Sequence, residues 1–163
     1  MLSHDRNIEI GRAVSDLIRT DIVKTRFAEA AGEAKEILSA DPSKLAASVV
    51  LPLELFGPSL PFELKSCRLS VMRGGTQYHI EKHPNATQYV LSINGNGAIR
   101  VKFSDEWLVS KLSSDPSVVL QERWHTVPAN TWHQPIPSEN DWTVVAFHTA
   151  PAGELKDEYW DAE

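Results

Sequence analysis

The first quarter of the chain carries apolar residues at the spacing of amphipathic helices. Ile10, Val14 and Ile18 recur every fourth position, which predicts one helix near the N-terminus. A second helical run covers about 22–39. Its apolar face is predicted from six positions: Ile22, Phe27, Ala30, Ala31, Ala34 and Ile37.

The pattern changes near residue 49, where prolines and short alternating segments replace the helical spacing. Asp41-Pro42, just before, is typical of a cap followed by proline at a first helical position, and predicts a short third helical turn. Beyond it, short segments alternate apolar and polar residues and are separated by turn-forming pairs. Many short strands at such spacing indicate a sandwich or barrel. We therefore expect a mainly β fold, with a helical extension (1–48) packed on a β-barrel (49–151), and a C-terminal helix or tail (152–163).

Composition narrows the possible partners. The 163 residues suit one domain, and 42% hydrophobic with 23% charged residues is an ordinary balance for a globular chain. A net charge of −6 argues against nucleic acid or an anionic membrane, since both favour a basic surface. A DNA-binding regulator is also disfavoured, because the helical N-terminus has mixed charge. A small molecule is the expected partner.

Location and assembly follow from similar arguments. No run approaches the ~20 apolar residues of a membrane helix, and the N-terminus lacks the apolar core of a signal peptide. Cys67 is the only cysteine, and one thiol cannot form an internal disulfide. We therefore expect a cytoplasmic protein with Cys67 buried in a strand. Exposed strand edges are commonly paired or covered, so we also expect a homodimer.

Potential metal ligands gather in one stretch, GTQYHIEKHPNATQYVLSING. His79, Glu81 and His83 stand two residues apart there, so on a strand all three side chains point to one face. A fourth candidate, His133, lies fifty residues further along. A strand that presents donors at every second residue, met by a histidine from a distant segment, predicts a metal site in an all-β pocket. The alternative is a polar interior satisfied by internal hydrogen bonds.

These residues resemble the two sequence motifs of the cupins, which are small jelly-roll barrels. The first motif runs from glycine through two histidines and a glutamate to a second glycine. This chain has the same spacing at Gly75, Glu81, His83, Gln88 and Gly95. The centre of the second motif is matched by Pro128, Asn130 and His133. The resemblance covers roughly residues 65–150 and implies a cupin-type jelly-roll barrel with a pocket inside it.

The chain departs from the cupin pattern at ligand positions. Glu81 replaces the first histidine and Gln88 replaces the glutamate, while Glu122 and Pro137 replace a glycine and an asparagine of the second motif. Two imidazoles and one carboxylate suit Fe(II), and also Mn, Zn or Ni, so a divalent transition metal is the expected cofactor. The resemblance then implies five candidate metal ligands: His83, His133, Glu81, Gln88 and, in place of Gln88, His79.

Other residues are candidates for chemistry beside the metal. Glu81 is a candidate general base. His148 ends the predicted strand 142–148, which the resemblance pairs with the 128–133 segment, and is a candidate acid, base or substrate contact. Three residues are candidates for substrate binding, as aromatic walls or a carboxylate clamp: Tyr78, Trp132 and Arg73. The alternatives are a solvent-side histidine, aromatics of the barrel wall and a surface arginine.

The resemblance implies an enzyme acting on a small molecule, because cupins include dioxygenases, isomerases, decarboxylases and lyases. The altered ligands favour a lyase over a dioxygenase, since a carboxylate beside histidine suits proton transfer with addition or elimination of water. The segment PANTWHQPIPSENDWTVVAFHTA, the chain length and the helical start are also similar to the 4-hydroxylaminobenzoate lyases, which release ammonia and form a catechol acid. The alternative is a non-catalytic cupin that binds a ligand without metal.

Overall fold

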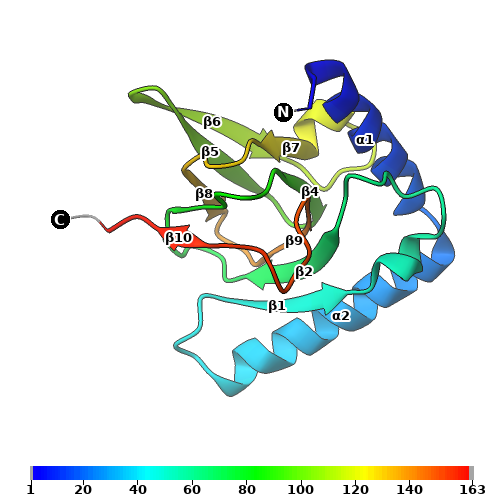
Figure 1. The fold of residues 1–163 in the computed structure, drawn as a ribbon. Coiled ribbons are helices and arrows are strands. Elements are labelled where there is room, and N and C mark those ends of the chain that lie inside the picture. Colours follow the sequence, from blue (N-terminus) through cyan, green and yellow to red (C-terminus); the bar gives the residue numbers. More distant parts are fainter. Residues whose placement is uncertain (1, 162–163) are drawn as a thin grey trace.

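The computed structural model describes residues 2–161, which form two facing β-sheets with two helices packed against one of them (Figure 1). The first sheet has the order β1 (Ala46–Leu51), β2 (Ser66–Met72), β9 (Trp142–His148), β4 (Gln88–Asn94) and β7 (Trp124–Val127). The second has the order β10 (Glu158–Tyr159), β3 (Glu81–Lys82), β8 (His133–Pro137), β5 (Gly97–Phe103) and β6 (Glu106–Leu112). The strand pairs are antiparallel. The predicted class, a mainly β jelly-roll barrel preceded by helices, is confirmed.

Both predicted helices are present, α1 at His4–Leu17 and α2 at Asp21–Ala40. Figure 1 shows α2 running along the outside of the first sheet, beside β1. Its buried face is rotated from the predicted one, because Ile22 and Ile37 are exposed. The face that packs on the sheet consists of Val23, Phe27, Ala30, Ala34 and Leu38. No helix within residues 2–161 is long and apolar enough to cross a membrane.

Two helical elements that the sequence allowed are not formed. The third helical turn does not form, because the Asp41 carboxylate accepts hydrogen bonds from the backbone N–H and hydroxyl of Ser43, which makes a turn, and β1 begins at Ala46. The C-terminal segment forms no helix over its described residues, and Glu158–Tyr159 instead pairs with β3 as the short strand β10. Residues 162–163 of the predicted tail lie outside the described residues. Two short 3-10 helices occupy connections: η1 (Leu53–Phe56) and η2 (Leu120–Glu122).

Alternation along the strands divides the interior into two layers. Tyr89 of β4 and Phe147 of β9 face the helices and join a large apolar cluster there, together with Cys67, which is buried as expected. Val90 lies one residue from Tyr89 and Val144 lies three from Phe147, so both face the other sheet, where they join a smaller cluster. A cluster of polar side chains occupies the end of this inner layer, where polar residues replace the apolar ones.

Candidate metal centre

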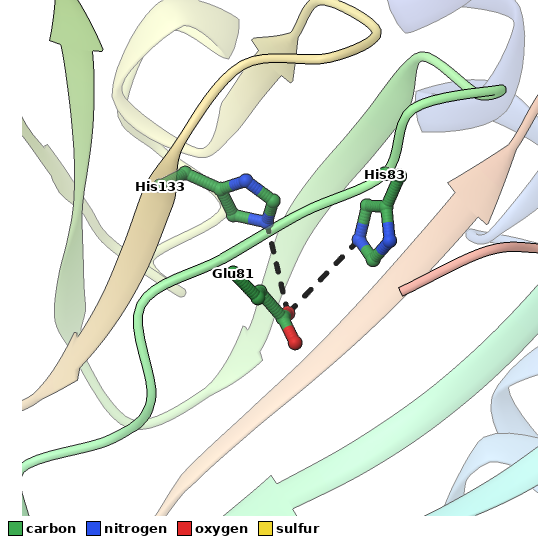
Figure 2. Close-up of side chains that lie close together, drawn as sticks. All are labelled: Glu81, His83 and His133. Atoms are coloured by element: carbon green, nitrogen blue, oxygen red, sulfur yellow. Dashed lines mark ion pairs between the residues drawn. The ribbon is translucent and has the colours of Figure 1, made fainter. Parts of the chain in front are cut away.

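Strand pairing brings predicted ligands together at one end of the inner layer. β3 and β8 place Glu81 directly opposite His133. His83 follows two residues after Glu81, so it returns to the same side of the chain. Figure 2 shows the two imidazoles and the carboxylate pointing toward one another. One ligand atom from each lies within 4.8 Å of the other two.

The atoms of this cluster are spaced for a shared cation rather than for direct hydrogen bonds. Glu81 Oε1 lies 3.7 Å from Nε2 of His133 and 4.0 Å from Nε2 of His83. Both distances exceed the roughly 2.7–3.2 Å of a normal hydrogen bond. Ligands held at about 2.1 Å around one ion lie roughly 3.0–3.5 Å apart. The two distances from the Glu81 oxygen would therefore have to shorten by roughly 0.2–1 Å for a metal ion to be shared.

Hydrogen bonds outside the cluster determine which nitrogen of each imidazole faces it. Nδ1 of His83 lies 2.8 Å from a carboxylate oxygen of Asp157, and Nδ1 of His133 lies 3.0 Å from the Thr131 carbonyl oxygen. Both partners can only accept, so each Nδ1 carries the proton and donates it. In a neutral ring each Nε2 then presents a lone pair, and the Nε2 of His133 is buried without a hydrogen-bond partner among residues 2–161. Partners of this kind orient metal-binding histidines.

Charge in the cluster also favours a cation. Burial lowers the pKa of His83 despite the opposing effect of Glu81. Burial alone would raise the pKa of Glu81, but the neighbouring imidazoles, His133 foremost, outweigh it and the pKa lies below the ordinary value. The anionic carboxylate oxygen therefore faces two Nε2 atoms, and a cation bound between them would take the place of the imidazole proton that lowers the pKa of Glu81. This donor set suits Fe(II), Mn, Zn or Ni.

Gln88 and His148 lie behind His83. They are direct partners in the pairing of β4 with β9. The expected pairing of the His148 strand with the 128–133 segment is wrong, since β9 pairs with β2 and β4. The Gln88 amide nitrogen lies 3.4 Å from Nε2 of His83 and 3.2 Å from Nε2 of His148, so it can donate to both rings. Half a turn of the amide would present its oxygen there instead. Burial holds the pKa of His148 well below its usual range, which keeps its ring neutral.

The structure does not bring three predicted residues into this cluster. His79 is exposed and packs between two tyrosine rings, because β3 begins only at Glu81 and the strand alternation does not extend back to it. Arg73 donates to backbone carbonyls at the C-terminal end of α2 and just beyond, where it stabilises the helix end. Trp132 packs against Trp160, with ring centroids 5.1 Å apart, and does not line the cavity beside the cluster.

A cavity of about 120 Å³ opens beside the cluster. Glu81, His133 and Gln88 line it, and Tyr78 is the predicted substrate contact that reaches it. Two further lining residues, Asp157 and Tyr159, come from the C-terminal segment. Sequence reasoning missed both of them, because no motif marks this segment.

Arg68 also lines the cavity and was missed, although β2 carries a signal for it. Cys67, Leu69 and Val71 are buried against the helices, so the alternate residues must face the inner layer. The guanidinium of Arg68 makes no hydrogen bond or ion pair with another of residues 2–161. An unpaired cation therefore stands at the wall of the cavity.

No protein-family model and no curated protein matches this sequence. Solved structures match its fold. Salicylate 1,2-dioxygenase from Pseudoaminobacter salicylatoxidans is 15% identical, with a TM-score of 0.58 over 85% of this chain and 36% of that one. The capsular polysaccharide assembling protein CapF from Staphylococcus aureus is 11% identical, with a TM-score of 0.57 over 74% of this chain and 33% of that one.

Oxalate decarboxylase from Lactobacillus farciminis is 11% identical, with a TM-score of 0.54 over 71% of this chain and 31% of that one. This chain thus spans about a third of the length of each of these neighbours. At such identities the likeness concerns the fold. These neighbours share the two-sheet barrel of this chain, and this is the fold that the cupin-like motifs of the sequence imply. The chain therefore has the cupin fold.

Proposed function

We propose that this protein is a metal-dependent enzyme that acts on a small carboxylate inside the barrel. The observation that carries the proposal is the convergence of two imidazoles and the Glu81 carboxylate, with the Nε2 of His133 buried and unpartnered among residues 2–161. His83, His133 and Glu81 would hold a divalent transition metal. Rotation of the Gln88 side-chain amide by half a turn would direct its oxygen there as a fourth ligand. When bound, such a metal polarises a substrate oxygen or lowers the pKa of a bound water.

The cavity favours a substrate of about one ring. Its volume of about 120 Å³ is close to that of a cavity of roughly 150 Å³ that holds benzene. Arg68 offers paired N–H donors that match a carboxylate in two parallel hydrogen bonds. Burial, and then the charge of Glu81, raise the pKa of the Tyr78 and Tyr159 phenols, so both stay protonated and can donate to substrate oxygens. The names of two structural neighbours, salicylate dioxygenase and oxalate decarboxylase, also refer to carboxylates.

Within this class we favour a lyase over a dioxygenase. A carboxylate beside two imidazoles suits addition or elimination of water, and one segment, the chain length and the helical start resemble the 4-hydroxylaminobenzoate lyases. In that reaction hydroxylaminobenzoate and water give a dihydroxybenzoate and ammonia. Two carboxylates, Glu81 and Asp157, border the cavity. Asp157 accepts the hydrogen bond from His83, so Glu81 is the candidate proton acceptor. His148 contacts the amide of Gln88, which in turn contacts His83, so we assign His148 the role of positioning Gln88.

Metal analysis tests the first part of the proposal. Protein purified from metal-supplemented medium should contain about one transition-metal ion per chain. The variants His133→Ala and Glu81→Gln should lose most of it, since each removes one of three ligands. His79→Ala is the matched control, because this exposed histidine lies two residues from Glu81 and should not affect binding. Metal-free wild type, or full metal occupancy in His133→Ala, would refute the assignment.

Turnover tests the reaction class. The metal-loaded protein is mixed with 4-hydroxylaminobenzoate without oxygen, and ammonia and dihydroxybenzoate are measured. Equal yields of the two would support the lyase, whereas consumption only with oxygen would favour a dioxygenase. Metal-free protein that binds benzoate and turns nothing over would support the ligand-binding alternative. Arg68→Lys should raise KM at least tenfold with a smaller effect on kcat, because a lysine cannot form the two parallel hydrogen bonds.

A further inference from the structure

A second, larger cavity lies on the helical side of the molecule. It measures about 700 Å³ and lies between α2, the end of α1, the ends of β4 and β9, and the segment before β7. It shares no lining residue with the cavity at the metal centre. Its volume falls in the range of roughly 300–1,000 Å³ that is typical of sites for small organic ligands.

One lining residue of this groove is a buried cation without a counter-ion. Arg123 is only 7% exposed, and its Nε has no hydrogen-bond partner among residues 2–161. The guanidinium forms no ion pair within the same residues. The carboxylate of Asp115 acts on Arg123 only through space, because it is exposed and already accepts two hydrogen bonds from Ser117. A buried unpaired charge is costly unless an anion compensates it, so the groove points to an anionic occupant.

The rest of the groove agrees with that chemistry. Three more cations line it, Arg19, Lys24 and Lys35, and no lining residue is acidic, although the whole chain carries a net charge of −6. Much of the remaining lining is apolar, with Phe27 and Ala31 from α2 and Ile93 from β4. A groove that combines a buried guanidinium with an apolar wall is complementary to an anionic head on an apolar body.

We propose that this groove binds a small amphipathic carboxylate, with the carboxylate at Arg123 and the apolar part along the exposed small residues of α2. Ala28, Ala31 and Gly32 leave the space for that apolar part, and a Cβ added at Gly32 would have no atom within 4 Å. The site is separate from the metal centre and does not depend on the proposed reaction.

Octanoate is the probe, and titration calorimetry is the measurement. Wild-type protein should bind octanoate with an affinity that falls with added salt, and should bind the neutral 1-octanol at least tenfold more weakly. Arg123→Met should weaken octanoate binding at least tenfold while its thermal midpoint stays equal or rises, because the variant removes an uncompensated buried charge. Arg100→Met, whose guanidinium stacks on Trp107 outside the groove, is the matched control and should bind as wild type.

A second variant blocks the groove without a change of charge. Gly32→Leu should fill the space, lose octanoate binding and unfold at a higher temperature, since glycine is a poor helix former. Gly32→Ala should gain stability and keep most of the binding. Both variants should retain the metal content of wild type.

Three results would overturn the proposal. They are equal binding of octanoate and octanol, unchanged binding in Arg123→Met, and a dimer that Gly32→Leu dissociates. The last result would make a second copy of the chain the occupant of the groove.

Discussion

At the scale of single residues, the candidate metal centre would depend on hydrogen bonds that fix the imidazole rings as much as on the proposed ligands themselves. His83 and His133 direct Nε2 toward Glu81 because their Nδ1 protons are held by Asp157 and by a backbone carbonyl. Spacing along a strand predicts Glu81 and His83 on one side, since alternation is a local property of the chain, but it also points to His79, which lies before β3 begins and stays outside the cluster. His133 comes from a distant segment and is predicted only through the second motif. Spacing cannot predict Asp157, which lies 74 residues from His83 in the sequence and belongs to no motif.

The role of Asp157 leads to a prediction on metal affinity. Asp157→Asn keeps the size of the side chain but weakens the charge-assisted hydrogen bond that orients His83. Metal affinity should fall about 10–100-fold, which competition with a chelator can measure. Asp161→Asn, in the same segment but without a recorded contact to the cluster, should match wild type. Unchanged affinity in Asp157→Asn would mean that the ring of His83 is held by its packing alone.

At the scale of elements, sequence periodicity predicts the helices and the existence of strands, but not which strands pair. The apolar spacing of α1 and α2 is local and strong, and both helices form where expected. β10 has only two residues and forms through pairing with β3, so no local pattern announces it. Strand pairing is also not local for β9. Its residue His148 lies opposite Gln88 of β4 rather than beside the segment that the resemblance implied.

Gly97 illustrates a constraint between elements that can be tested. A Cβ at this first residue of β5 would overlap the ring of Trp142, which is fully buried and donates from Nε1 to the Ser92 hydroxyl. The ring therefore cannot move aside without loss of that hydrogen bond. Gly97→Ala should lower the free energy of unfolding by about 1–3 kcal/mol in a denaturant titration. Gly32→Ala, in the open part of α2, should raise it by about 1 kcal/mol.

At the scale of the whole molecule, an ion pair connects helix α1 to the segment between η1 and β2. Arg6 of α1 donates to both carboxylate oxygens of Glu63, at 2.6 and 2.9 Å. The hydrogen bond from Arg6 holds the pKa of Glu63 below its ordinary value. The pair therefore stabilises the fold fully above the ordinary glutamate pKa of about 4.3, and the contribution is lost as pH falls through the lower folded-state value.

Replacement of Glu63 should accordingly have an effect that depends on pH. Glu63→Gln should lower the thermal midpoint by about 2–4 °C at pH 7, and the difference from wild type should shrink as the pH drops below about 4. Glu9→Gln tests the exposed second partner of Arg6 and should change the midpoint little at either pH. A difference that stays constant down to pH 2 would show that the pair does not titrate with folding.

The two sheets differ in how their outer faces are covered, and this bears on the predicted homodimer. Both helices cover the first sheet, whereas β6 forms an edge of the second and exposes Leu108 and Val109. An uncovered apolar edge strand is a template for pairing with another chain. We therefore predict that two copies pair through β6, and sedimentation should give twice the 18.2 kDa of one chain. Val109→Lys should shift the species to the monomer, because a lysine on an edge strand opposes pairing. Val119→Lys is the control, because this valine is equally exposed but lies outside the sheet, and the variant should remain dimeric. A monomeric wild type would exclude the pairing through β6.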